Sequence, residues 1–113
     1  MTIGALTTIH QFCKMGDYSF AGMNASITMD VPSFIKVASN PARVVGLNSV
    51  GMERGGIDLE TITILKKAYK TIYRRGFNLK DAIEKIESME SNDLQEVQNF
   101  LDTIKSSERG ILR

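Results

Sequence analysis

Residues 3–32 consist of five consecutive six-residue words, and this repeat constrains the fold more than any other feature of the chain. Each word begins with an apolar residue, three of the five have Gly at the second position, and the fifth position is small or β-branched. The words span residues 3–8, 9–14, 15–20, 21–26 and 27–32. A period of six is typical of a parallel β-helix in which each word forms one side of a triangular coil. The sequence therefore predicts β-helix coils over residues 1–32 rather than a meander of short strands.

After residue 32 the hexads stop. Residues 33–56 contain four glycines and the pair Asn40-Pro41, which favours an extended or turn geometry, so they are expected to form an irregular connector. From residue 57 the apolar period becomes helical, and residues 57–113 are expected to form a helical C-terminal domain. The fold class predicted is thus β then α, with the last coils of a β-helix followed by three helices.

The three expected helices have recognisable start and stop signals. The first follows an N-cap at Asp58 and ends before Gly76, the second follows Asn78, and the third covers about residues 93–106. In the first helix, the residues expected on the buried face share helical spacing: Leu59, Ile62, Leu65, Tyr69, Ile72 and Tyr73.

Composition excludes several classes of protein. The 113 residues suit one domain, and no apolar run approaches the roughly 18 residues of a membrane span. The start lacks the features of a signal peptide, so a cytoplasmic location is expected. The single cysteine, Cys13, cannot form an internal disulfide, and one cysteine with one histidine cannot form a zinc site. Cys13 is interpreted as a small buried hydrophobe, and no metal is expected.

Five words raise a physical difficulty. Coils of this kind take about three words each, so five words complete fewer than two coils. Repeats need neighbours to bury their faces, and an uncovered coil would expose apolar side chains and unpaired strand groups. We therefore expect either a longer β-helix or an edge covered by other chains.

Charge is segregated along the chain although the net charge is only +1. Residues 57–76 carry five basic and two acidic groups, whereas residues 77–108 carry three basic and eight acidic groups. The basic groups of the first segment are Lys66, Lys67, Lys70, Arg74 and Arg75. Three interpretations stay open: a solvated helix face, a nucleic-acid surface, and a docking surface for an acidic protein. Near-neutral net charge and the acidic segment that follows argue against nucleic acid.

Seven short motifs, spread over most of the chain, resemble one family. They are Ile9-His10-Gln11-Phe12-Cys13, Asp30-Val31-Pro32, Asn40-Pro41-Ala42, Gly46-Leu47-Asn48, Ala68-Tyr69-Lys70, Tyr73-Arg74-Arg75-Gly76 and Arg109-Gly110-Ile111-Leu112-Arg113. Together they are similar to the C-terminal part of the acyl-carrier-protein-dependent UDP-N-acetylglucosamine O-acyltransferases of lipid A synthesis. This resemblance implies a left-handed parallel β-helix with a helical C-terminal domain, assembled as a homotrimer.

The resemblance also implies roles for individual residues. His10 and Gln11 match a pair that contacts the acceptor sugar nucleotide, UDP-N-acetylglucosamine. Asn48 and Arg54 match positions that contact the same nucleotide, and an arginine fork suits a diphosphate. Met23 matches the position that sets acyl chain length, where a long side chain implies a shorter hydroxyacyl group.

The resemblance also implies that catalysis needs a residue outside this sequence. The family's general base lies upstream of any residue in this sequence, so no catalytic residue is assigned to this chain, and the chain alone is expected not to turn over. No cofactor is expected beyond the phosphopantetheine of acyl carrier protein, and the basic residues from Lys66 to Arg75 are interpreted as its docking surface. Val50 and Gly55 depart from the family pattern, in which Glu and Arg can contact the nucleotide. The alternative is a catalytically incomplete module for trimerisation and binding.

Overall fold

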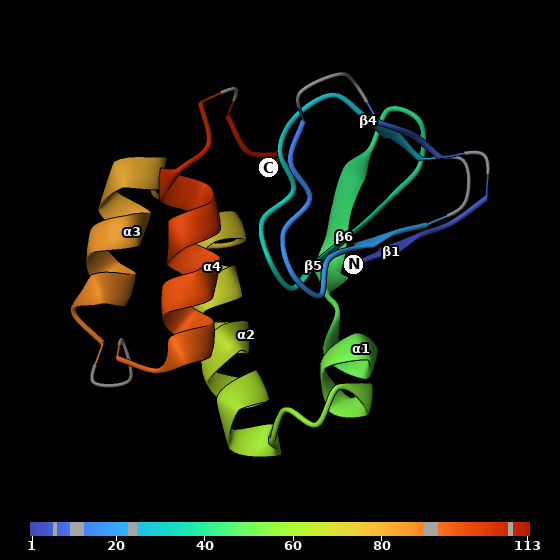
Figure 1. Ribbon diagram of the computed structural model, residues 1–113. Coiled ribbons are helices and arrows are strands. Elements are labelled where there is room, and N and C mark those ends of the chain that lie inside the picture. The colour runs from blue at the N-terminus through green and yellow to red at the C-terminus, as the bar shows by residue number, and fades with distance from the viewer. Residues whose placement is uncertain (6, 10–12, 23–24, 90–92, 109) are drawn as a thin grey trace.

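The computed structural model describes residues 1–5, 7–9, 13–22, 25–89, 93–108 and 110–113. Short strands wind into coils on one side of the molecule, and three longer helices pack together on the other (Figure 1). The strands are β1 (Thr2–Ile3), β2 (Thr8–Ile9), β3 (Phe20–Ala21), β4 (Ser26–Ile27), β5 (Ile35–Ala38) and β6 (Arg43–Leu47). The helices are α1 (Ser49–Arg54), α2 (Leu59–Tyr73), α3 (Leu79–Glu87) and α4 (Gln95–Lys105).

The hexads form parallel coils, as the sequence predicts. β1 pairs in parallel with β3, with Thr2 opposite Phe20, and β2 pairs in parallel with β4, with Thr8 opposite Ser26. Each pair joins residues that are three words apart in the sequence, so three words make one turn of the coil. Backbone hydrogen bonds hold successive turns together, as where the Thr8 N–H donates to the Ala25 carbonyl over 2.8 Å.

Small residues face the interior of the coil. Ser19 and Ala25, which hold the fifth position of their words, are 0% and 1% exposed. The glycine at the second position of the third word is required by a close approach, because a Cβ on Gly16 would lie 2.4 Å from the Ser33 backbone nitrogen. In the first turn the apolar positions are less covered, and Ile3 is 43% exposed.

Residues 33–56 are not the irregular connector that was expected. β5 adds to the coil by pairing in parallel with β3, and β6 then pairs with β5 in the antiparallel sense. The antiparallel pair ends the stacking of parallel turns. In β5, buried and exposed residues alternate over only four positions, with Ile35 and Val37 buried and Lys36 exposed between them. Such a short alternation is a weak signal in the sequence. The six-residue α1 follows β6 directly.

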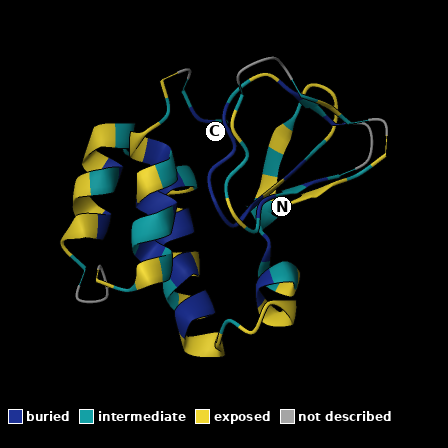
Figure 2. Cartoon of the chain, in the orientation of Figure 1, coloured by how far each residue is buried: buried dark blue, intermediate teal, exposed yellow. Residues whose placement is uncertain are grey.

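The helix starts follow the predicted caps. The Asp58 carboxylate accepts from the Thr61 N–H over 2.8 Å, and the Asn78 side chain accepts from the Asp81 N–H over 2.8 Å. The prediction that Leu59 is buried is wrong. Leu59 is 70% exposed, because it occupies the first turn of α2, which protrudes into solvent (Figure 2). The last helix begins at Gln95 rather than near residue 93, and its N-cap has no side-chain hydrogen bond.

A single hydrophobic core joins the coils to the helices. Phe34 and Ile35 from the coil belong to the same buried cluster as Leu65 of α2 and Phe100 of α4. Polar contacts cross the same boundary, since the Ser33 Oγ donates to Asn99 Oδ1 over 3.1 Å. No described helix has the length and apolar character needed to cross a membrane.

Candidate functional site

Asn48 fixes the short helix α1 against the coil. Its side-chain oxygen accepts from the Gly51 N–H over 3.2 Å, and its side-chain amide donates to the Tyr18 carbonyl over 2.8 Å. Its backbone N–H donates to the Phe34 carbonyl over 2.7 Å. Asn48 is 8% exposed, so these bonds are largely shielded from water. The side chain therefore has a structural role, and one N–H and one oxygen lone pair remain for a ligand.

A pocket of about 520 Å³ lies beside α1 and brings two predicted residues together. Its lining residues come from the first coil turns, β5 and α1: Met1, Thr2, Tyr18, Ser19, Phe20, Lys36, Asn48, Val50, Gly51 and Arg54. We call it the α1 pocket. Asn48 and Arg54, predicted from a motif, thus share one cavity. Lys36 was missed by the sequence reasoning, because its strand was expected to be irregular.

The α1 pocket is electropositive and has an aromatic wall. The Lys36 ammonium lies 5.6 Å from the centre of the Phe20 ring, and Arg54 is exposed at the end of α1. Neither side chain forms a salt bridge with a carboxylate among the described residues. Two unpaired cations beside aromatic rings suit an anion that carries a planar group, because the arginine fork binds phosphate oxygens in pairs.

Gly55 lies against the side chain of Tyr18. A Cβ at this position would lie 2.5 Å from an atom of the Tyr18 ring. That ring stacks on Phe34 with centroids 5.7 Å apart. Val50 lies in the pocket lining and is 58% exposed. The Tyr18 ring therefore occupies the space that a side chain at Gly55 would need.

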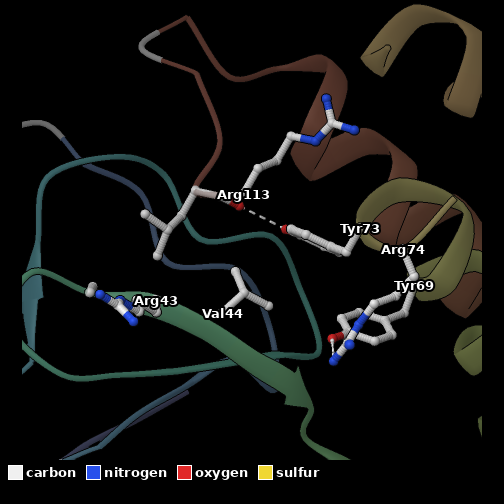
Figure 3. A pocket seen from close by; sticks show the side chains of 8 residues that line it. Arg43, Val44, Tyr69, Tyr73, Arg74 and Arg113 are labelled. Carbon is white, nitrogen blue, oxygen red and sulfur yellow. Dashed lines mark hydrogen bonds between the residues drawn. The ribbon is translucent and has the colours of Figure 1, made fainter. Parts of the chain in front are cut away.

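The five predicted docking residues, three on α2 and two just beyond its end, are all exposed. Arg74 lines a pocket with Tyr69 and Tyr73 at the end of α2 (Figure 3). Lys67 and Arg75 line a different pocket, of about 240 Å³, together with Thr71, Phe77, Lys85 and Met89. The predicted docking residues are therefore accessible, and three of them line two different pockets.

Three predicted site residues, His10, Gln11 and Met23, lie outside the described residues. Within the described ranges, no group of three or more His, Cys, Asp or Glu side chains could hold a metal ion. Cys13 is half-buried and packs against the hydrophobic core. The described part of the site thus consists of binding groups, namely two cations, an amide and aromatic walls.

Comparison with known proteins gives one consistent result. Residues 30–112 match the family model described as UDP-N-acetylglucosamine O-acyltransferase, domain 2. Over 105 residues the chain is 44% identical to the acyl-(acyl-carrier-protein)–UDP-N-acetylglucosamine O-acyltransferase of Halorhodospira halophila, covering 93% of this chain and 40% of that protein. The protein of the same name from Ectopseudomonas mendocina is 40% identical over 98% of this chain and 43% of its own length.

A solved structure agrees with these relatives. The structure of LpxA from Acinetobacter baumannii superposes with a TM-score of 0.92 at 40% identity, over 98% of this chain and 43% of that chain. The chain thus spans less than half the length of the relatives it matches.

Proposed function

Because this chain belongs to the UDP-N-acetylglucosamine O-acyltransferase family, we propose that it forms part of an enzyme that transfers a 3-hydroxyacyl group from acyl carrier protein to the 3-hydroxyl of UDP-N-acetylglucosamine. In this reaction the sugar oxygen attacks the thioester carbonyl, the C–S bond breaks, and the carrier's phosphopantetheine thiol leaves. The sugar proton passes to a general base. No residue of this chain is assigned as that base, because its single histidine, His10, matches a binding position.

The observation that carries this proposal is the α1 pocket. Asn48 and Arg54 match the family's nucleotide-contacting positions, and they share a cavity with a second unpaired cation, Lys36. We propose that Arg54 and Lys36 bind the diphosphate of UDP-N-acetylglucosamine, and that His10 and Gln11 hold its sugar. Phe20 and Tyr18 offer ring surfaces to the uracil. This chain thus contributes acceptor binding, with no cofactor of its own.

The finer architecture is part of the same proposal. We infer that the coil is left-handed, that residues 57–113 act as a helical C-terminal domain, and that the protein assembles as a homotrimer whose neighbouring coils complete each site. Trimerisation would also cover apolar positions such as Ile3, which is 43% exposed in this chain. We place the reaction in the cytoplasm, with no nucleic-acid partner.

An acyl-transfer assay tests the reaction. The complete enzyme, of which this chain is proposed to form a part, is incubated with 3-hydroxydecanoyl carrier protein and UDP-N-acetylglucosamine, and the acylated nucleotide is detected by mass spectrometry. Arg54→Ala should lower kcat/KM about tenfold or more, because a charge-assisted hydrogen bond to phosphate contributes about 1.5–3 kcal/mol. Lys80→Ala removes one positive charge from the exposed face of α3, outside the α1 pocket, and should have a much smaller effect. Binding of UDP-N-acetylglucosamine without any transfer would favour the alternative of a non-catalytic module.

The basic face of α2 is proposed to dock the acyl carrier protein. Lys66, Lys67, Lys70, Arg74 and Arg75 are exposed, and none of them forms a salt bridge with a described carboxylate. Exposed cations of one sign accelerate association with an acidic protein, and salt screens this effect. The charge reversal Lys66→Glu with Lys70→Glu should slow association about tenfold at low salt, measured by stopped-flow fluorescence. The α3 reversal Lys80→Glu is the control, and equal slowing by both would contradict docking on α2.

Met23 is proposed to limit the length of the acyl chain. The variant Met23→Gly should shift the preferred donor from shorter to longer 3-hydroxyacyl chains, because it removes the side chain expected to block the acyl groove. Competition between carrier proteins with acyl chains of different length, read by mass spectrometry of the products, measures this shift. An unchanged product distribution would remove Met23 from the proposal.

A further inference from the structure

A second cationic pocket lies where β6 meets the end of α2 and the C-terminal residues. It has a volume of about 540 Å³ and is lined by Ala42, Arg43, Val44, Tyr69, Tyr73, Arg74, Leu112 and Arg113. We call it the arginine–tyrosine pocket. Figure 3 shows Arg43 on the strand side, Tyr69 and Arg74 on the helix side, and Val44 between them. It shares no lining residue with the α1 pocket.

One of its three arginines is already committed to the fold. Arg113 Nη2 donates to the Ile72 carbonyl over 2.7 Å and to the Phe77 carbonyl over 2.9 Å. The bond to Ile72 satisfies a carbonyl at the end of α2 and reduces the negative potential that a helix C-terminus would present to an anion.

The other two arginines are available. Within the described residues, the side chain of Arg43 makes no hydrogen bond or salt bridge. Arg74 Nη2 donates only to the Tyr69 hydroxyl, over a long 3.4 Å, and its guanidinium lies 5.9 Å from the centre of the Tyr69 ring. Both side chains are exposed. Two guanidinium groups that line the same cavity without a carboxylate partner favour an anionic ligand.

The two tyrosine hydroxyls differ in whether their proton already has an acceptor within the fold. The Tyr73 hydroxyl donates to the Leu112 carbonyl over 2.9 Å, so its proton is used within the fold. The Tyr69 hydroxyl accepts from Arg74, and its own proton has no acceptor among the described residues. Tyr69 can therefore donate one more hydrogen bond toward the cavity, beside the Arg74 guanidinium.

We propose that the arginine–tyrosine pocket binds a phosphate ester. Arg43 and Arg74 bind its oxygens, Tyr69 donates a further hydrogen bond, and Ala42, Val44 and Leu112 contact the apolar part of the ester. A phosphate fits better than a carboxylate, because three donor side chains, one on β6 and two at the end of α2, match a group that has more acceptor oxygens than a carboxylate has.

Two phosphate esters take part in the reaction proposed above: the phosphopantetheine arm of the carrier and the nucleotide sugar. The identity of the ester rests on that proposed function, whereas the presence of an anion site does not. The same chemistry suits both sources, so the experiment must separate them.

Isothermal titration calorimetry with three probes tests the site: pantetheine 4′-phosphate, pantetheine without phosphate, and UDP. The phosphate ester should bind at least about tenfold more tightly than pantetheine, because each charge-assisted hydrogen bond contributes roughly a decade of affinity. Affinity should rise from pH 5.5 to 7.5, as the phosphate, whose second pKa is about 6, gains its second charge while arginine stays protonated.

Variants locate the site. Arg43→Ala with Arg74→Ala should weaken binding of the bound ester at least about thirtyfold, and Tyr69→Phe should weaken it about threefold or more. Lys80→Ala, which removes an exposed cation on α3 away from this pocket, should leave it unchanged. Arg43, Arg74 and Lys80 are all exposed, so these variants are expected to fold.

The outcomes are distinct. If the double variant weakens pantetheine 4′-phosphate but not UDP, the carrier's arm is the source; if it weakens UDP, the nucleotide is the source. Undiminished binding of both esters by the double variant, or no binding of either ester to the unaltered protein, would overturn the proposal. Because these titrations need no acyl transfer, failure of the transfer assay would leave the anion site standing.

Discussion

The α1 pocket and the arginine–tyrosine pocket are similar in size and charge, but they are supported in different ways. Each cavity has more than 500 Å³ of volume and two exposed cations without a described carboxylate partner. The α1 pocket depends on one buried side chain, Asn48, which ties α1 to the coil through Tyr18. The other depends on the C-terminal segment, whose residues bond to Ile72 and Tyr73 from about forty positions away. The first support is centred on one side chain, and the second is a segment of the chain.

These two kinds of support make the pockets vulnerable at different places. The cap and two hydrogen bonds from Asn48 to the coil hold α1, so a change there should loosen one short helix. The C-terminal segment instead bridges the coil and α2. On the coil side, the Asp30 carboxylate accepts from Ser107 Oγ, and the Leu112 N–H donates to the Asp30 carbonyl. Changes at Asp30 should therefore reach the arginine–tyrosine pocket while leaving the α1 pocket intact.

The largest loss of stability is expected from a substitution at Asp30. Its carboxylate is 3% exposed and accepts from the Lys14 N–H over 2.7 Å and from Ser107 Oγ over 2.6 Å. Asp30→Ala should lower the free energy of unfolding by about 3 kcal/mol, because buried donors lose a charged acceptor. Urea unfolding measures this loss. The exposed Asp102→Ala on α4 is the control, and an equal effect of the two would contradict the special role of Asp30.

A smaller effect is expected at Asn48. Asn48→Ala removes both the α1 cap and the bond to Tyr18, and should lower the free energy of unfolding by about 2 kcal/mol. Asn78→Ala is a matched control, since Asn78 caps α3 but makes no described side-chain bond to the coil. It should cost about 1 kcal/mol. If both variants lost the same free energy of unfolding, the hydrogen bond from Asn48 to the Tyr18 carbonyl would contribute nothing to stability.

The effect at Tyr73 should depend on pH. Tyr73→Phe removes the bond to the Leu112 carbonyl and should cost about 1 kcal/mol at pH 7. Burial raises the pKa of Tyr73 well above its ordinary value of 10. The folded state thus keeps a proton that the unfolded state loses, so the unaltered protein loses stability as the pH rises above 10. The difference in free energy of unfolding between the unaltered protein and Tyr73→Phe should therefore become smaller above pH 10. Urea unfolding at pH 7 and pH 11 measures this difference. A difference that stayed constant would contradict the effect of burial on Tyr73.

The smallest effect is expected at Asp58, which lies at the far end of α2 from the arginine–tyrosine pocket. Hydrogen bonds from the Thr61 side chain and backbone lower the pKa of its carboxyl. The contribution of this cap is therefore present above the ordinary pKa of 3.8 and is lost as the pH falls through the lower folded value. Asp58→Ala should lower the melting temperature slightly at pH 7 and by less at pH 2. Loss of ligand binding in either pocket would contradict this purely local role.

The sequence predicted the elements that carry a strong local signal. Hexads repeat over enough residues to identify the coil, and Asp58 and Asn78 mark helix starts because a cap needs only a side chain and a nearby N–H. It did not predict β5, β6 or α1, because four to six residues are too few to display a period. Leu59 shows the reverse error, since helical spacing alone does not reveal which turn protrudes beyond its neighbours.

The same reasoning applies to the pockets. Asn48 and Arg54 lie six residues apart, so a motif could identify both, although only the structure shows that Asn48 also holds α1 in place. Arg43 lies on a strand and Arg74 caps the end of a helix, and the two are distant in sequence. No local pattern links them, and their shared cavity follows from how α2 packs beside β6.

A crystal structure of the protein with UDP-N-acetylglucosamine would decide whether the α1 pocket is the acceptor site. We expect the diphosphate oxygens within about 3 Å of the Arg54 guanidinium, as a charge-assisted hydrogen bond requires, and the Lys36 ammonium beside them. A nucleotide bound with its diphosphate away from Arg54, for example between Arg43 and Arg74, would contradict the assignment of the α1 pocket as the acceptor site.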